Sequence, residues 1–281
     1  MTKRGASPGP GSAVRAHPQR SLAQGAKSSF WLICCALSLA SCATQPAQRQ
    51  RLAWADARQL VLVVTPDWDA NHGILRTYTR DAGDWQPAGE TTPVVIGRAG
   101  AAWGLGLHPP QPGPAKREGD GRSPAGVFAI GSAFGYAESA STGLPYLALS
   151  AQDYCIDVSG SPFYNLIVDK RVVGAAAVAR STEPMRRDLL ADGDQAYKAG
   201  FVIEHNPRGV TGAGSCIFAH LWKSADSATA GCTAMPEASM RMVLAQLEAS
   251  AHPVFVLLPR AEYERLRAAW QLPSITTITT P

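Results

Sequence analysis

A thiol and an imidazole lie close together in the last third of this 281-residue chain. His220 precedes Cys232 by twelve residues, and Gly231 stands directly before the thiol. The run Cys216–Trp222 alternates between two largely apolar faces, which predicts a buried strand that carries His220. Pro236 opens a predicted helix, so the helix dipole is expected to lower the pKa of the thiol. The pattern predicts a Cys232 nucleophile with His220 as its base and backbone N–H groups near Gly231 as an oxyanion site.

A plainer interpretation exists for each residue alone. A single cysteine is more often a small buried hydrophobic residue, and a single histidine is more often structural. The surrounding motif decides between the two. His220 on a strand, followed by a loop and Thr229-Ala230-Gly231-Cys232, resembles the active-site motif of the YkuD-type L,D-transpeptidases, in which a strand His precedes a Ser/Thr-x-Gly-Cys turn.

Three further segments resemble a divergent branch of that family. The resemblance as a whole runs from about residue 59 to residue 258, and its separate motifs stand in the order that the family has. They are Ile96-Gly97 through Trp103-Gly104, the Gly/Asp-rich stretch from Lys116 to Phe128, and Tyr164-Asn165.

The resemblance implies a peptidoglycan-modifying enzyme that acts on stem peptides through a Cys232 thioester, with no metal or organic cofactor. Three departures leave the acceptor open, because the family commonly has His at position 230, Arg at 234 and Gly or Ser at 221, where this chain has Ala230, Ala234 and Leu221. One alternative is a peptidoglycan hydrolase or amidase with the same Cys-His site. The other is a non-catalytic wall-binding lipoprotein.

Other polar residues are weaker candidates. Arg117 and Arg122 could bind the carboxylates of an anionic stem peptide, since guanidinium groups bind carboxylates bidentately, although a solvated charged loop explains them equally well. Asn165 is a further candidate for substrate binding. Glu118 and Asp120 form a short acidic cluster without histidine partners, which does not predict a metal site.

Three cysteines remain beyond the N-terminal region. In an oxidising compartment an odd number predicts one disulfide and one free thiol. Cys155 and Cys216 both fall in predicted strands, so a Cys155–Cys216 disulfide is expected, which leaves Cys232 free. The alternative is a two-thiol site, because Cys216 and His220 share a face of the predicted strand.

Residues 1–41 read as an export signal rather than as part of the fold. A basic segment precedes the apolar run from Phe30 to Ala40, which is too short to span a bilayer. Leu39-Ala40-Ser41-Cys42 resembles a bacterial lipobox, which implies lipidation of Cys42 and attachment to the periplasmic face of a membrane. Ala43 favours the outer membrane by the same resemblance, and the alternative is an ordinary cleaved signal. Residues 42–58 are then a polar tether.

Charge excludes one class of partner. The signal region holds five basic residues and no acidic ones, so the rest of the chain has 21 basic and 22 acidic residues. A nearly neutral domain offers no basic surface for nucleic acid.

The elements that must position the site are mostly strands. β-branched and apolar runs predict strands at 59–65, 74–79, 92–96, 126–130, 146–149, 154–158, 200–204, 216–222 and 254–258. Helices are expected at 184–190, 236–250 and 261–270, the second with an apolar stripe of Met240, Val243, Leu244 and Leu247. The sequence predicts a mostly β single domain, a YkuD-like β-sandwich or partly open barrel with few short helices. The catalytic domain is expected at 59–260, followed by a helix and tail at 261–281.

Overall fold

The computed structural model describes residues 51–275. The predicted signal, the Cys42 lipidation site and the end of the predicted tail lie outside these residues. The strands are β1 Gln59–Thr65, β2 His72–Thr79, β3 Gln86–Pro87, β4 Thr92–Val95, β5 Ala101–Trp103, β6 Ser123–Gly135, β7 Tyr146–Ala148, β8 Asp153–Cys155, β9 Ile167–Asp169, β10 Glu183–Pro184, β11 Ala199–Ile203, β12 Phe218–Leu221, β13 Thr233–Met235 and β14 Val254–Pro259. The α-helices are α1 Lys170–Val173, α2 Ala175–Val178, α3 Glu237–Gln246 and α4 Arg260–Leu266, and the 3₁₀ helices are η1 Arg187–Asp192, η2 Ala196–Lys198 and η3 Ala249–Ala251.

The large sheet closes on itself. Its order is β1-β14-β6-β11-β12-β13-β4-β2, and β1 pairs with β14 in parallel and with β2 antiparallel. These eight strands form a barrel, to which β3, β5 and β7 add short pairings. The expected mostly β fold with few short helices is therefore confirmed. The barrel is closed because both edges of β1 are paired, which leaves no free edge in the ring.

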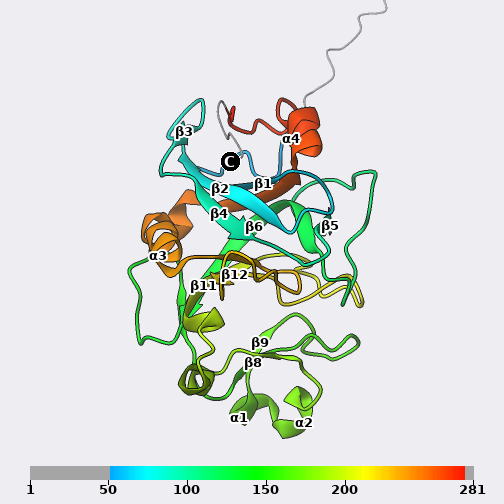
Figure 1. Ribbon diagram of the computed structural model, residues 1–281, viewed down its shortest axis with the longest axis vertical. Helices are drawn as coiled ribbons and strands as arrows, with labels where there is room; N and C mark the ends of the chain where they lie inside the picture. The colour runs from blue at the N-terminus through cyan, green and yellow to red at the C-terminus, as the bar shows by residue number, and fades with distance from the viewer. Residues whose placement is uncertain (1–50, 276–281) are drawn as a thin grey trace, which may run out of the picture. The chain divides into compact units, whose positions relative to one another are not determined.

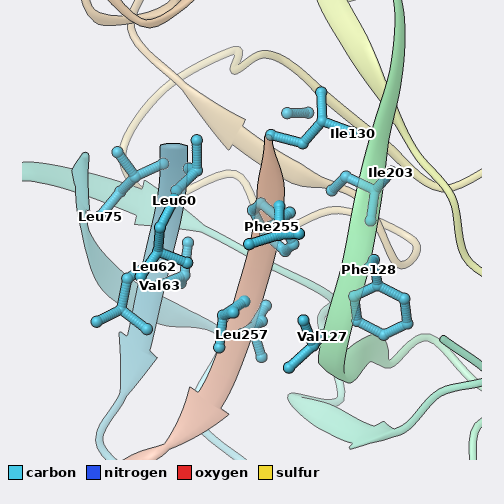
Figure 2. Close-up of a cluster of buried hydrophobic side chains, with 14 of the residues drawn as sticks. Leu60, Leu62, Val63, Leu75, Val127, Phe128, Ile130, Ile203, Phe255 and Leu257 are labelled. Atoms are coloured by element: carbon cyan, nitrogen blue, oxygen red, sulfur yellow. The ribbon is translucent and has the colours of Figure 1, made fainter. Parts of the chain in front are cut away.

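The barrel core explains the apolar runs of the sequence. β1 and β14 are buried along nearly their whole length, and their mutual pairing is parallel. Strands buried on both faces read as continuous hydrophobic runs rather than as alternating ones. Figure 2 shows side chains from β1, β14 and β6 gathered in one buried cluster, among them Leu62, Phe255 and Val127. This core gives the neighbouring strands β11 and β12 a rigid support.

A small second sheet lies beside the barrel end that carries β11 and β12 (Figure 1). Its strand order is β10-β8-β9, and the short helices α1 and α2 follow β9. A disulfide joins Cys155 in β8 to Cys216, two residues before β12. This bridge ties the small sheet to the strand that carries His220.

Several elements differ from their sequence prediction. The expected helix at 184–190 is absent, because Glu183–Pro184 form β10 and Arg187–Asp192 form a 3₁₀ helix. Pro184 has no N–H and restricts the residue before it to extended backbone, which suits a short strand. The helix after Pro236 ends at Gln246 rather than near 250. No sequence pattern predicted β13, whose three residues directly follow Cys232.

The folded unit also extends past its predicted bounds. Trp54 and Ala57, within the expected tether, are buried in the barrel core, and the Trp54 indole N–H donates to the carbonyl of Trp270. Tyr263 and Leu266 of α4 belong to the same core. The segments on either side of residues 59–260 thus pack against each other and against the barrel. Between residues 51 and 275, no helix has the length and apolar character required to cross a membrane.

Candidate active site

His220 lies in β12, and Cys232 directly precedes β13, which pairs with β12 in parallel. The register pairs Ala219 with Thr233 and His220 with Ala234, and one step back it sets Phe218 beside Cys232. Neighbouring positions in a sheet direct their side chains to the same face, and positions two apart share that face. Cys232 and His220 are therefore diagonal neighbours on one face of the β12–β13 pair. The spacing of twelve residues is spanned by a loop that brings the second strand back beside the first.

The Cys232 thiol is buried, with 7% of the residue exposed. The backbone N–H of Phe218 donates to Sγ at 3.3 Å, and the thiol itself donates to the carbonyl of Cys216 at 3.4 Å. Burial raises the pKa of the thiol, and the nearby Glu183 acts in the same direction, against smaller opposing effects of the Phe218 N–H and Lys116. The expectation of a lowered pKa is wrong, because β13 separates Cys232 from the start of α3 and desolvation dominates.

The imidazole of His220 is held through one ring nitrogen. Nδ1 lies 2.9 Å from the carbonyl oxygen of Leu221, which places the proton on Nδ1 and leaves Nε2 as the basic atom. Burial lowers the pKa of His220, partly offset by the Leu221 carbonyl and by Asp194. A neutral imidazole with a free Nε2 is the form that a general base needs.

Hydroxyl groups fix the turn that presents Cys232. The Thr229 hydroxyl donates to the Cys232 carbonyl at 2.6 Å and accepts from the Gly231 N–H at 3.2 Å. The Ser123 hydroxyl, at the start of β6, lies 2.7 Å from the Gly231 carbonyl and 3.1 Å from the Cys232 carbonyl, and it accepts from the Gly97 N–H. The Thr-x-Gly-Cys turn is thus clamped between its own threonine and a neighbouring strand.

Gly231 packs closely against the neighbouring backbone. A Cβ at this position would lie 3.1 Å from the carbonyl oxygen of Arg122, so the missing side chain makes room for the protein backbone. The Gly231 N–H already donates to Thr229. An oxyanion at this N–H would therefore have to replace that bond.

The loop before β6 is organised by one carboxylate. Asp120 accepts from the Lys116 ammonium at 2.6 Å and from the backbone N–H groups of Arg117 and Arg122. Glu118 accepts from the hydroxyls of Tyr164 and Ser215. Residues 51–275 hold no group of three or more His, Cys, Asp or Glu side chains that could bind a metal ion.

The predicted substrate-binding residues have different settings. Arg122 donates to the carbonyls of Trp68 and Ala101 and to the Asp69 carboxylate, so its guanidinium is engaged within the protein.

Asn165 is likewise committed to the fold. Its amide nitrogen donates to the carbonyls of His205 and Asn206, and its amide oxygen accepts from the Cys216 N–H. Of the three predicted residues, Arg117 is the exposed one.

Cys216 is part of the fold around the nucleophile. It is buried, bonded to Cys155 and has a positive φ of 56°. A non-glycine residue adopts that backbone only when its surroundings impose it. The disulfide is the pairing expected from the sequence, and it leaves Cys232 as the free thiol among the described residues. In this arrangement Cys216 offers a carbonyl to Cys232 rather than a second thiol.

Two residues near the site were missed by sequence reasoning. Tyr197 in η2 packs its ring against His220, with centroids 5.5 Å apart. Its hydroxyl donates to Glu183 in β10. Neither residue lies within twenty positions of the Cys-His motif, and no local pattern marks them, so only the fold brings them to the site.

Comparison of the chain with protein-family models, with curated proteins and with solved structures finds no match.

Proposed function

We propose that this protein is a cysteine acyltransferase of the L,D-transpeptidase type that acts on peptidoglycan stem peptides. One observation supports it most: Cys232, directly before β13, and His220 in β12 lie on the same face of this strand pair. Nδ1 of His220 is engaged by Leu221, and Nε2 is left free. Nucleophile, base and a third group that orients the base form the arrangement that activates a thiol. The closed barrel is, on this proposal, a divergent form of the YkuD fold.

The reaction would run through a thioester. Nε2 of His220 takes the Cys232 proton as Sγ attacks the carbonyl carbon of the stem peptide. The C–N bond then breaks, and the imidazolium gives the proton to the leaving amine. An acceptor amine attacks the thioester, forms a new amide and restores the thiol. Water in place of the amine gives hydrolysis.

Burial sets the order of proton transfer. Desolvation raises the pKa of Cys232 and lowers the pKa of His220, so both groups are neutral in the resting site. The proton therefore moves as the sulfur attacks, rather than beforehand. The thiol proton, which points to the Cys216 carbonyl, must first rotate toward His220.

The cellular setting is part of the same proposal. The lipobox-like Leu39–Cys42 would anchor the protein to the periplasmic face of the outer membrane by an N-terminal lipid. Stem peptides of the wall would then lie within reach of the tethered domain. The Cys155–Cys216 disulfide suits such an oxidising compartment.

Acylation by a carbapenem tests the nucleophile. The wild-type protein is expected to gain the mass of one opened β-lactam, located on Cys232 by peptide mapping. Cys232→Ala should gain none, and His220→Gln should react about 10²-fold more slowly, the usual contribution of a general base. Equal labelling of Cys232→Ala, or an unlabelled and inactive wild type, would rule out the enzyme and favour a wall-binding role.

Incubation with purified sacculi separates transfer from hydrolysis. New 3–3 cross-links, absent with Cys232→Ala, would support transfer to an amine. Shortened stems without new cross-links would support the hydrolase or amidase alternative. Ala230 and Ala234 stand where the family commonly has His and Arg, so the acceptor is the part of the reaction that this experiment must define.

A further inference from the structure

Tyr197 covers the face of β12 that carries His220. The residue lies in η2, directly before β11, and is 7% exposed. Its ring meets the His220 imidazole at 5.5 Å and 62°, and the Phe218 ring at 5.8 Å and 86°. Both contacts are edge-to-face, the arrangement that aromatic rings favour. One tyrosine thus spans the two side chains of β12 that face Cys232.

A half-buried carboxyl group holds that tyrosine in place. The Tyr197 hydroxyl donates to Oε1 of Glu183 in β10. β10 pairs with β8, where Glu183 stands opposite Cys155, and the Ser181 hydroxyl donates to the Cys155 carbonyl at 2.6 Å. The disulfide from Cys155 to Cys216 then connects β8 to the residues directly before β12. Glu183 is therefore carried by an element that is covalently tied to the active-site strand.

The imidazole needs more than its one hydrogen bond. The bond from Nδ1 to the Leu221 carbonyl selects the tautomer, but it still allows the ring to tilt. The Tyr197 ring limits that tilt, because its centroid lies 5.5 Å from the imidazole centroid in an edge-to-face contact, and a close-packed neighbour restricts rotation toward it. We propose that Tyr197, anchored by Glu183, is the positioning residue that keeps Nε2 of His220 directed at Cys232. This inference rests on the proposed function and assigns a residue to the same site.

The state of Glu183 fits an anchoring role. Burial raises its pKa to about 8, and the carboxylates of Asp157, Asp194 and Glu118 act in the same direction. The group is thus largely uncharged at pH 7, and the carboxylate that raises the pKa of Cys232 forms mainly above about pH 8. Asp194, which precedes η2, also acts on His220 and favours the imidazolium. Glutamine is therefore a close substitute for Glu183 at neutral pH.

The test measures the rate at which iodoacetamide alkylates Cys232, as a function of pH, in the full chain. This readout needs no peptidoglycan and reports on the Cys-His pair itself. Tyr197→Leu is expected to lower the rate at pH 7 about 30-fold. Its acid limb should also move to higher pH, because water reaches the imidazole and its pKa returns toward the ordinary value.

Graded variants separate the ring from its anchor. Tyr197→Phe keeps the ring but loses the hydroxyl, and about a 5-fold loss is expected. Glu183→Gln keeps an acceptor and should stay within 2-fold of wild type at pH 7, whereas Glu183→Ala should match Tyr197→Phe. Tyr146→Phe is the matched control, since its hydroxyl donates to the Ala137 carbonyl away from β12, and no change is expected.

Two results would overturn the proposal. One is a folded Tyr197→Leu protein with the wild-type rate and acid limb. The other, should that variant fail to fold, is a set of Tyr197→Phe and Glu183→Ala proteins with wild-type rates. A lower melting temperature with an unmoved pH profile would mean that Tyr197 only stabilises the fold. Failure of carbapenem acylation in the wild type would instead count against the proposed enzyme, while the alkylation profiles would still report on Tyr197.

Discussion

The hydroxyl of Ser123 holds the turn before the nucleophile in place, although Ser123 is far from Cys232 in the sequence. Its side chain is fully buried and contacts the Gly97 N–H and the carbonyls of Gly231 and Cys232. Ser123→Ala removes the partner of the Gly97 N–H and of the Gly231 carbonyl, whereas the Cys232 carbonyl keeps the Thr229 hydroxyl. We therefore expect a loss of about 1–3 kcal/mol in the free energy of unfolding. Urea denaturation measures it, with the exposed Ser141→Ala as control.

The same variant should also react more slowly at Cys232, since the turn loses its attachment to β6. A Ser123→Ala protein that is as stable as Ser141→Ala and labels at the wild-type rate would contradict this role.

Residue types and spacing singled out Cys232 and His220, and the resemblance of the Thr-x-Gly-Cys turn to a family motif decided for a catalytic pair. Both signals are local to one strand–loop–strand segment. Spacing could not assign Arg122 or Asn165. The partners of Arg122 lie up to 54 residues away and those of Asn165 up to 51, and these contacts engage both side chains within the protein. The pKa of Cys232 was mispredicted for a related reason. Burial is a property of the fold and outweighed the helix that the sequence placed nearby.

At the scale of elements, long apolar strands were predictable and short ones were not. β1 and β14 have continuous β-branched and apolar runs that few other structures accommodate. β13 has only Thr233, Ala234 and Met235, too few residues for a periodic signal. It becomes a strand because β12 and β4 flank it in the ring. The strand that aligns Cys232 with His220 is thus a product of tertiary pairing.

The disulfide between β8 and the residues before β12 is expected to stabilise the fold. It closes a loop with a sequence separation of 61 residues, for which chain entropy in the unfolded state corresponds to roughly 4 kcal/mol of stability. The double variant Cys155→Ala/Cys216→Ala should lose about that much, measured by urea denaturation. Dithiothreitol should destabilise the wild type and leave the double variant unchanged. A fully reduced wild type with unaltered stability, its thiols counted by mass, would show that the bridge does not support the fold.

For the whole molecule, composition and strand patterning predicted the mostly β fold class, but they did not predict that the sheet closes into a barrel. A barrel and a sandwich both need short strands with irregular connections. The distinction depends on β1 pairing with β2 on one side and β14 on the other. β2 follows β1 directly in the sequence, whereas β14 is nearly 200 residues away. No local sequence pattern specifies the pairing with β14. The burial of Trp54 against Trp270 has the same origin, since it joins two segments near opposite ends of the described chain.

Buried histidines make the stability of the whole fold depend on pH. Burial lowers the pKa of His205 to about 4 and also lowers the pKa values of His108 and His220. His205 is neutral in its setting, because Nδ1 accepts from the Leu105 N–H and Nε2 lies 2.9 Å from the Ala213 carbonyl. Protonation would set two donors against each other at Nδ1.

The sign of the effect follows from proton binding. Below pH 6.5 the unfolded chain takes up a proton on His205 that the folded chain refuses until about pH 4, so stability falls as the pH drops through this window. Glu183, whose pKa is raised to about 8, has the opposite effect, because the folded state keeps a proton that the unfolded state loses above its ordinary pKa.

Urea denaturation at pH 7 and pH 4.5 should show a contribution from His205 on the order of 2 kcal/mol. His205→Gln, which cannot be protonated, should be less sensitive to acid by that amount, and an unchanged difference between the two pH values would place the acid sensitivity elsewhere in the fold.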